Sequence, residues 1–253
     1  MISPRAARLV ASIHKWLGLI IGAQLIVWTA TGLYFASIPI EQIRGEHYWD
    51  AVDHGAIDLS RVKLSALDAA KVVVEDQPKF IRLRSFLGDP VYEIRADIGF
   101  FMVSAETGGV RSPLTYEDAS EVVIAATGGL GRPANPFPSL GLEENASLIT
   151  ENPPHEYAGP IPAWVFEYSG GGHNKLYLDA LTGETIVVRT DVWRTYDFLW
   201  SLHIMDWGPA RENFNTPWLV AAAVFALSTV LFGVVLLVHR FTRGVLREKK
   251  ETP

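Results

Sequence analysis

Three histidines occupy positions where a membrane protein could use them for chemistry. His14 and His239 stand at the ends of two long apolar runs, and His203 precedes the second run in a segment rich in tryptophan. Ionisable residues at membrane depth are costly and usually functional, and neutral imidazole is the usual axial ligand of b-type haem. The chain has no cysteine, which excludes thiolate ligation of iron. Histidine-ligated haem is one chemistry that these positions allow, and polar anchors facing lipid headgroups are the alternative.

Two glycines follow His14 along the first apolar run. Gly18 and Gly22 are spaced four residues apart after His14, so all three residues share one face of a helix. A strip with almost no side chain leaves room for a bulky, flat group such as haem. The same Gly-x-x-x-Gly spacing also lets two helices pack closely. The sequence therefore leaves both cofactor binding and helix packing open for Gly18 and Gly22.

Membrane depth decides which histidines could share one iron. A bis-histidine haem needs two imidazoles at the same level, and the ends of the two runs place His14 and His239 together at the inner edge. His203 lies at the outer edge, where neither run offers a second histidine. It would need a second copy of the chain or another subunit. Because two helices enclose a haem poorly, bound haem predicts a homodimer or a larger membrane complex.

The two apolar runs are long enough to cross a lipid bilayer. Residues 14–36 and residues 217–239 would each span roughly 35 Å as helices, against a hydrocarbon core of about 30 Å. Residues 37–216 carry 14 basic and 26 acidic residues, whereas the rest of the chain carries eight basic and two acidic ones. The positive-inside rule then makes residues 1–13 a cytoplasmic lead and residues 240–253 a cytoplasmic tail. We expect an uncleaved protein of the bacterial inner membrane with a periplasmic central domain.

The central domain has an α+β pattern that occurs twice. Residues 64–110 predict one helix and then an antiparallel meander, and residues 116–190 repeat this order. Each unit contains a similar turn, at residues 104–108 and 179–183. Residues 191–207 predict an amphipathic helix whose three tryptophans favour the membrane–water boundary. We therefore expect two transmembrane helices that flank two helix-plus-antiparallel-sheet units.

Other candidate sites carry weaker signals. His47 and His54 lie near Trp49 and could contact a metal or ligand, or form a solvated aromatic cluster. Residues 170–173 could bind a metal but also fit a hairpin loop. The loop at residues 128–144, which is rich in glycine and proline, could line a binding site or act as a spacer. The sequence contains no phosphate-binding loop, no G-x-S-x-G and no H-E-x-x-H.

These motifs, in this order, resemble the PepSY-associated transmembrane family. The resemblance is carried by two motifs in the first apolar run, by the two repeated turns and by a motif before the second run: His14–Gly18, Thr31–Gly32, Ala105–Gly108, Asp179–Gly183 and Leu202–His203. It covers nearly the whole chain and implies that the two central units are PepSY-like. It also implies that His14 and His203 are haem ligands, whereas His239 is a candidate on depth alone.

The resemblance implies a redox function. Members of that family include inner-membrane reductases of ferric siderophores, in which haem b carries electrons across the membrane. Those reductases have four membrane helices and this chain has two, which again indicates dimerisation or a partner. PepSY units also occur in protease propeptides, so the alternative is a non-enzymatic, membrane-anchored binding or regulatory module, or an accessory subunit of a larger membrane complex. We expect the lipid bilayer, but no nucleic acid, as a partner.

Overall fold

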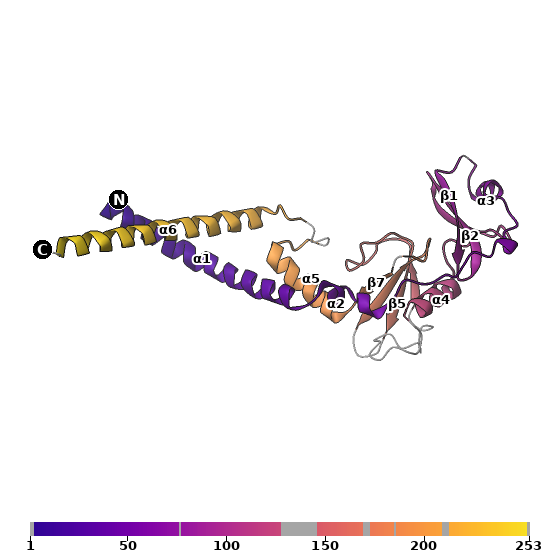
Figure 1. The fold of residues 1–253 in the computed structure, drawn as a ribbon, viewed down its shortest axis with the longest axis horizontal. Helices are drawn as coiled ribbons and strands as arrows, with labels where there is room; N and C mark the ends of the chain where they lie inside the picture. The colour runs from indigo at the N-terminus through magenta and orange to yellow at the C-terminus, as the bar shows by residue number, and fades with distance from the viewer. Residues whose placement is uncertain are drawn as a thin grey trace. The chain divides into compact units, whose positions relative to one another are not determined.

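The computed structural model describes most of the chain as two compact units (Figure 1). The described residues are 3–75, 77–127, 146–168, 173–184, 186–208 and 213–251, with side chains through Thr242. One unit, here the membrane unit, comprises Met1–Ile38 and Tyr196–Pro253, and the soluble unit comprises Pro39–Thr195. The loop at residues 128–144 and residues 170–172 lie outside the described residues.

The membrane unit is built on two long helices. Helix α1 (Pro4–Ser37) and helix α6 (Pro217–Glu251) are the helices of the described chain that are long and apolar enough to cross a membrane. Their starts follow from local sequence. The side chain of Ser3 accepts a hydrogen bond from the Ala6 amide, and Thr216 accepts one from the Leu219 amide at 3.2 Å. In both helices a proline follows the capping residue, where its missing N–H costs nothing.

Helices α1 and α6 pack side by side along a seam with alternating spacings of three and four residues. The buried and half-buried positions include His14, Leu17, Ile21, Gln24, Trp28, Thr31 and Phe35 on α1, and Leu219, Ala222, Ala226, Thr229, Gly233 and Leu236 on α6. This spacing is typical of helix pairs that cross at about 20°. The alanines and the glycine on α6 let the two backbones approach closely.

The tryptophan-rich segment forms helix α5 (Asp191–Ile204), as the sequence predicted. The helix ends three residues before the expected end at residue 207. Its backbone turns at Met205, whose φ of 52° is left-handed, and the Asp206 amide then donates to the Ser201 carbonyl. This bond closes the helix as a Schellman-type cap does.

The first part of the soluble unit is the predicted helix and meander. Helix α3 (Ala66–Val73) precedes β1 (Phe80–Phe86), β2 (Asp89–Ala96) and β3 (Gly99–Ser104), which form an antiparallel sheet in the order β1-β2-β3. The turn between β1 and β2 lies one residue earlier than the expected turn at residues 88–90. Leu87 and Gly88 adopt φ values of 51° and 83°, so β2 already begins at Asp89.

The second part repeats the order with one strand more than expected. Helix α4 (Tyr116–Ala126) has the predicted bounds, and the sheet has the order β4-β5-β6-β7. Its strands are β4 (Ala146–Ile149), β5 (Ala163–Tyr168), β6 (Asn174–Asp179) and β7 (Ile186–Arg189). The sequence pattern missed β4, a four-residue edge strand. The segment before α3 forms α2 (Ile40–Arg44) and two single 3-10 turns, Glu46–Tyr48 and Leu59–Arg61.

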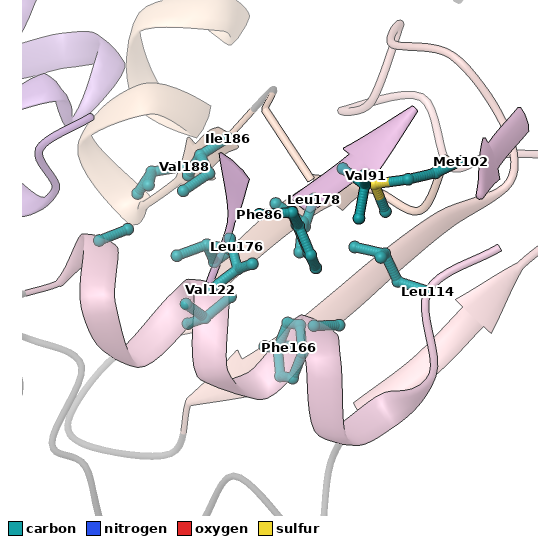
Figure 2. Close-up of a cluster of buried hydrophobic side chains, with 13 residues drawn as sticks. Phe86, Val91, Met102, Leu114, Val122, Phe166, Leu176, Leu178, Ile186 and Val188 are labelled. Atoms are coloured by element: carbon teal, nitrogen blue, oxygen red, sulfur yellow. The ribbon is translucent and has the colours of Figure 1, made fainter. Parts of the chain in front are cut away.

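The two sheets and α4 share one hydrophobic core. Phe86, Val91 and Met102 come from the first sheet, and Figure 2 shows them beside Phe166 and Leu178 of the second. All five side chains are almost completely buried. The two repeats are therefore one folded body in which each half completes the core of the other.

A buried ion pair also helps to connect the two sheets. Glu93 on β2 is 1% exposed, and its carboxylate accepts hydrogen bonds from Arg82 and Arg84 on the neighbouring strand. The Arg84 guanidinium also donates to the Thr182 carbonyl at 2.7 Å. Because Thr182 lies in the turn between β6 and β7, this arginine ties the first sheet to the second.

We predict that Glu93→Ala destabilises the soluble unit strongly. The change leaves Arg84, whose side chain is 12% exposed, with only the half-exposed Glu184 carboxylate at 3.8 Å, and the loss of the buried member of such a pair costs about 3–5 kcal/mol. Urea unfolding of the full chain, followed by near-UV circular dichroism, measures this loss. Glu121→Ala on the exposed side of α4 is the matched control, with an expected change below about 0.5 kcal/mol. Equal losses in both variants would contradict the prediction.

Candidate functional site

His203 is held by a hydrogen bond from α5 to α1. Its Nδ1 atom lies 2.7 Å from Oγ1 of Thr31, which is 4% exposed. The Thr31 hydroxyl donates its own hydrogen to the Val27 carbonyl at 2.8 Å. With that hydrogen on the Val27 carbonyl, the hydroxyl oxygen accepts from Nδ1, which places the hydrogen of the neutral imidazole on Nδ1 and the lone pair on Nε2.

Aromatic side chains fix the plane of the His203 ring. Trp200 stacks on it with ring centres 6.2 Å apart and an angle of 6° between the planes. Phe35 meets it edge-on at 5.4 Å. The Trp28 indole N–H donates to the His203 carbonyl at 2.8 Å, which anchors the end of α5 on α1. The imidazole thus has one defined orientation within the membrane unit.

His14 makes a similar hydrogen bond through Nδ1, farther toward the start of α1. Its Nδ1 atom lies 2.9 Å from the Thr229 carbonyl oxygen on α6. A carbonyl can only accept, so Nδ1 again carries the hydrogen and Nε2 carries the lone pair. The ring packs on Gly233, where an added Cβ would lie 3.1 Å from its Cε1 atom.

Gly233 is a site residue that the sequence reasoning missed. A glycine inside a helix costs about 1 kcal/mol relative to alanine, and Gly233 is the single glycine of the second apolar run. That cost was the signal that something packs closely there. In the structure the close neighbour is the His14 ring.

His14 and His203 each leave one ring nitrogen available. Among the described residues, the ring of each of these two histidines makes one hydrogen bond, and it makes this bond through Nδ1. Neither Nε2 is among the buried, unpaired atoms of the described residues, and both side chains are partly exposed. Histidines that bind metals commonly donate Nδ1–H to an oxygen and coordinate through Nε2. Each ring can therefore give one bond to a metal or a haem iron.

The structure does not bring His14 and His239 to one level. The His14 ring lies against Gly233, which precedes His239 by six residues, about 9 Å along α6. The expected pairing took the ends of the apolar runs as aligned. Helix α1 instead begins at Pro4, so His14 lies well inside it and meets the middle of α6. Both ring nitrogens of His239 are buried and find no hydrogen-bond partner among the described residues.

His14 and His203 are also far from each other. Thr31, which binds His203, follows His14 by 17 residues, or about 25 Å along α1. Between these levels, Gly18 and Gly22 face open space, since an added Cβ at either would meet no atom within 4 Å. One chain therefore offers two well-separated single imidazoles, with an uncovered glycine face between them.

The soluble unit holds a separate cavity beside His54. It has a volume of about 350 Å³ and is lined by Trp49, Asp50, Ala51, Val52, His54, Gly183, Glu184 and Ile186. The Nδ1 atom of His54 accepts a hydrogen bond from the Leu87 amide at 3.2 Å. Burial and the nearby Arg84 charge lower the pKa of His54 from 6.5, against the opposing effects of Glu184 and Asp53. His47 instead lies against Tyr48, with ring centres 3.8 Å apart and ring planes tilted by 44°.

Comparison with known proteins adds no relative. No family model, no curated protein and no solved structure matches the chain. In the described part of the chain, no three histidine, aspartate or glutamate side chains are grouped so that they could hold a metal ion. The resemblance to the PepSY-associated transmembrane family stays a prediction, and the histidines of the membrane unit are the candidate site.

We predict that Thr31→Val releases the His203 ring. The change removes the acceptor of Nδ1–H, a bond worth about 1 kcal/mol, so the preference for the Nδ1–H tautomer should fall about fivefold. ¹⁵N NMR of histidine-labelled protein measures the tautomer directly. Thr31→Ser keeps the hydroxyl and should retain the wild-type tautomer. A valine variant with unchanged ¹⁵N shifts would show that Thr31 does not orient the ring.

We also predict that protonation of His54 destabilises the soluble unit. Because the folded-state pKa lies below the unfolded value of 6.5, the unfolded chain binds more protons as the pH falls through 6.5. The contribution of His54 to the free energy of unfolding should therefore be constant above pH 7.5 and decrease at lower pH. His54→Asn keeps an acceptor for the Leu87 amide but does not titrate. Urea unfolding from pH 8 to pH 5 should show a weaker pH dependence in this variant.

Proposed function

We propose that this protein is a haem-b protein of the bacterial inner membrane that transfers electrons across the membrane to periplasmic ferric iron or a ferric siderophore. One observation carries the proposal. The Nδ1 atoms of the partly exposed His14 and His203 lie 2.9 Å and 2.7 Å from an oxygen of the membrane unit, an arrangement that leaves Nε2 of each ring for a ligand. A merely anchoring histidine needs no such arrangement at both sides of the membrane.

The surroundings of the two rings fit a haem. Each histidine supplies one axial nitrogen, and the Nδ1 bond raises its basicity as a ligand. Trp200 and Phe35 shield the His203 ring, while Gly18 and Gly22 leave space for a flat group beside α1. Bound haem would supply one-electron redox chemistry, and the chain holds, orients and covers it. At either level, a second histidine for such a group would have to come from outside the chain.

The distance between the histidines gives the proposal a direction. With both termini in the cytoplasm, His14 lies toward the cytoplasmic side and His203 toward the periplasmic side. The two levels are about 25 Å apart along α1, close to the thickness of the hydrocarbon core. Two haems at these levels would carry electrons in series across the bilayer. Ferric iron as the acceptor rests on the resemblance to siderophore reductases.

A second candidate function is a membrane-anchored binding module. The observation that favours it is the cavity beside His54, which combines the Trp49 indole with the carboxylates of Asp50 and Glu184. Such a module would work without haem. It predicts that substitutions at His14 and His203 leave function intact.

The visible spectrum of the purified protein tests the proposal. We expect a Soret band from full-length protein produced with ample haem, and its loss in the His14→Ala,His203→Ala double variant. His173→Ala, an exposed histidine of the soluble unit, is the matched control and should keep the full band. After reduction, the haem spectrum should return to the oxidised form when a ferric chelate is added. A wild-type protein without a Soret band would contradict the proposal and favour the binding module.

A further inference from the structure

Each level of the membrane unit supplies half of a bis-histidine site. Within one chain, His14 and His203 are about 25 Å apart along α1. The ring nitrogens of His239 are enclosed by its own chain. Among the described residues, then, no second imidazole can reach the iron that either accessible Nε2 would bind. A haem at either level is incomplete without a second molecule.

The way in which copies of one chain enter a membrane limits how they can pair. All copies insert in the same orientation, because the same basic flanks remain inside. A closed pair of identical subunits has twofold symmetry, and its axis must then run along the membrane normal. Such an axis places every residue at the same depth as its equivalent in the partner. His14 and the partner subunit's His203 would instead differ in depth by about 25 Å.

We propose that two copies of this chain form a parallel dimer in which each haem is held by the same histidine from both subunits. His14 and the partner subunit's His14 bind the inner haem, and His203 and the partner subunit's His203 bind the outer haem. This inference rests on the proposed haem function and names its partner and its ligand pairs.

The membrane helices have the free surface that such a dimer needs. Within the most apolar 18-residue stretch of each helix, 11% of the α1 stretch and 6% of the α6 stretch are buried inside the chain. A stable interface buries about 1,200–2,000 Å² in total, and the uncovered sides of two helices in each subunit can supply it. Gly18 and Gly22, which meet no atom of their own chain within 4 Å, leave space beside the inner ligand. Four helices then surround each haem.

Haem content per chain tests the ligand pairs. Wild-type protein should bind one haem per chain, which is two per dimer. His14→Ala and His203→Ala should each halve this value, and the haem that remains should keep the low-spin electron paramagnetic resonance signal of two histidine ligands. His14→Met, which keeps a ligand at the site, should show methionine ligation and guards against simple misfolding. His239→Ala should retain both haems; loss of one haem in this variant would overturn the assignment of the inner pair.

Mixed dimers distinguish the pairing of equivalent histidines from crossed pairing, in which His14 of one subunit pairs with His203 of the other. The His14→Ala and His203→Ala chains are co-expressed with different affinity tags, and dimers that contain both are isolated by tandem purification. In a parallel dimer, each level of this mixed species has one histidine, so we expect no bis-histidine low-spin haem. Crossed pairing would join the intact His14 of one chain to the intact His203 of the other. One low-spin haem retained per mixed dimer would therefore overturn the proposal.

The same samples distinguish failure of this inference from failure of the proposed function. A wild-type protein with haem whose differently tagged copies do not co-purify would overturn the dimer alone. In that case the second ligand would come from another protein. A wild-type protein without any Soret band would overturn the proposed function, and the dimer site with it.

Discussion

A hydrogen bond from Nδ1–H of an imidazole to an oxygen inside the membrane unit is the interaction on which the candidate site depends. Thr31 provides the acceptor for His203, and the Thr229 carbonyl provides it for His14. In lipid, a polar group left unpaired costs several kcal/mol, so each ring must satisfy its N–H within the protein. The same bond that makes the histidine tolerable also fixes which nitrogen keeps its lone pair. One hydrogen bond therefore both allows the ring to lie inside the membrane unit and leaves Nε2 available as a ligand.

The register of α1 on α6 determines what each histidine can reach. Gly233 allows the His14 ring to lie against α6, and Thr229 fixes its level there. The Trp28 indole fixes the end of α5 at the level of Thr31. Because His14 and Thr31 are 17 residues apart on one helix, these contacts hold the two imidazoles about 25 Å apart along α1. The geometry of a single chain thus produces two half-sites.

Most elements of the fold could be predicted from the sequence, because they follow local rules. Helix α4 has its predicted bounds since Thr115 caps it and apolar residues recur at helical spacing. The missed strand β4 is a short edge strand whose order depends on pairing with β5, which no local pattern encodes. The site shows the same division. The candidate histidines were visible at the ends of the apolar runs and on the tryptophan-rich segment before the second run, but the partner of His14 depends on helix register, which the ends of the runs do not reveal.

The soluble unit shows why repeated sequence units need not act as repeated domains. Phe86 of the first sheet packs against the core that α4 and the second sheet form, and guanidinium groups of Arg84 and Arg111 lie 5.2 Å from its ring. Arg84 in turn is held by the buried Glu93 and by the Thr182 carbonyl. Without the second sheet, Phe86 would lose part of the core that covers it and Arg84 would lose the Thr182 carbonyl. The His54 cavity is lined from the segment before α3 and from the β6–β7 turn, so it exists only in the complete unit.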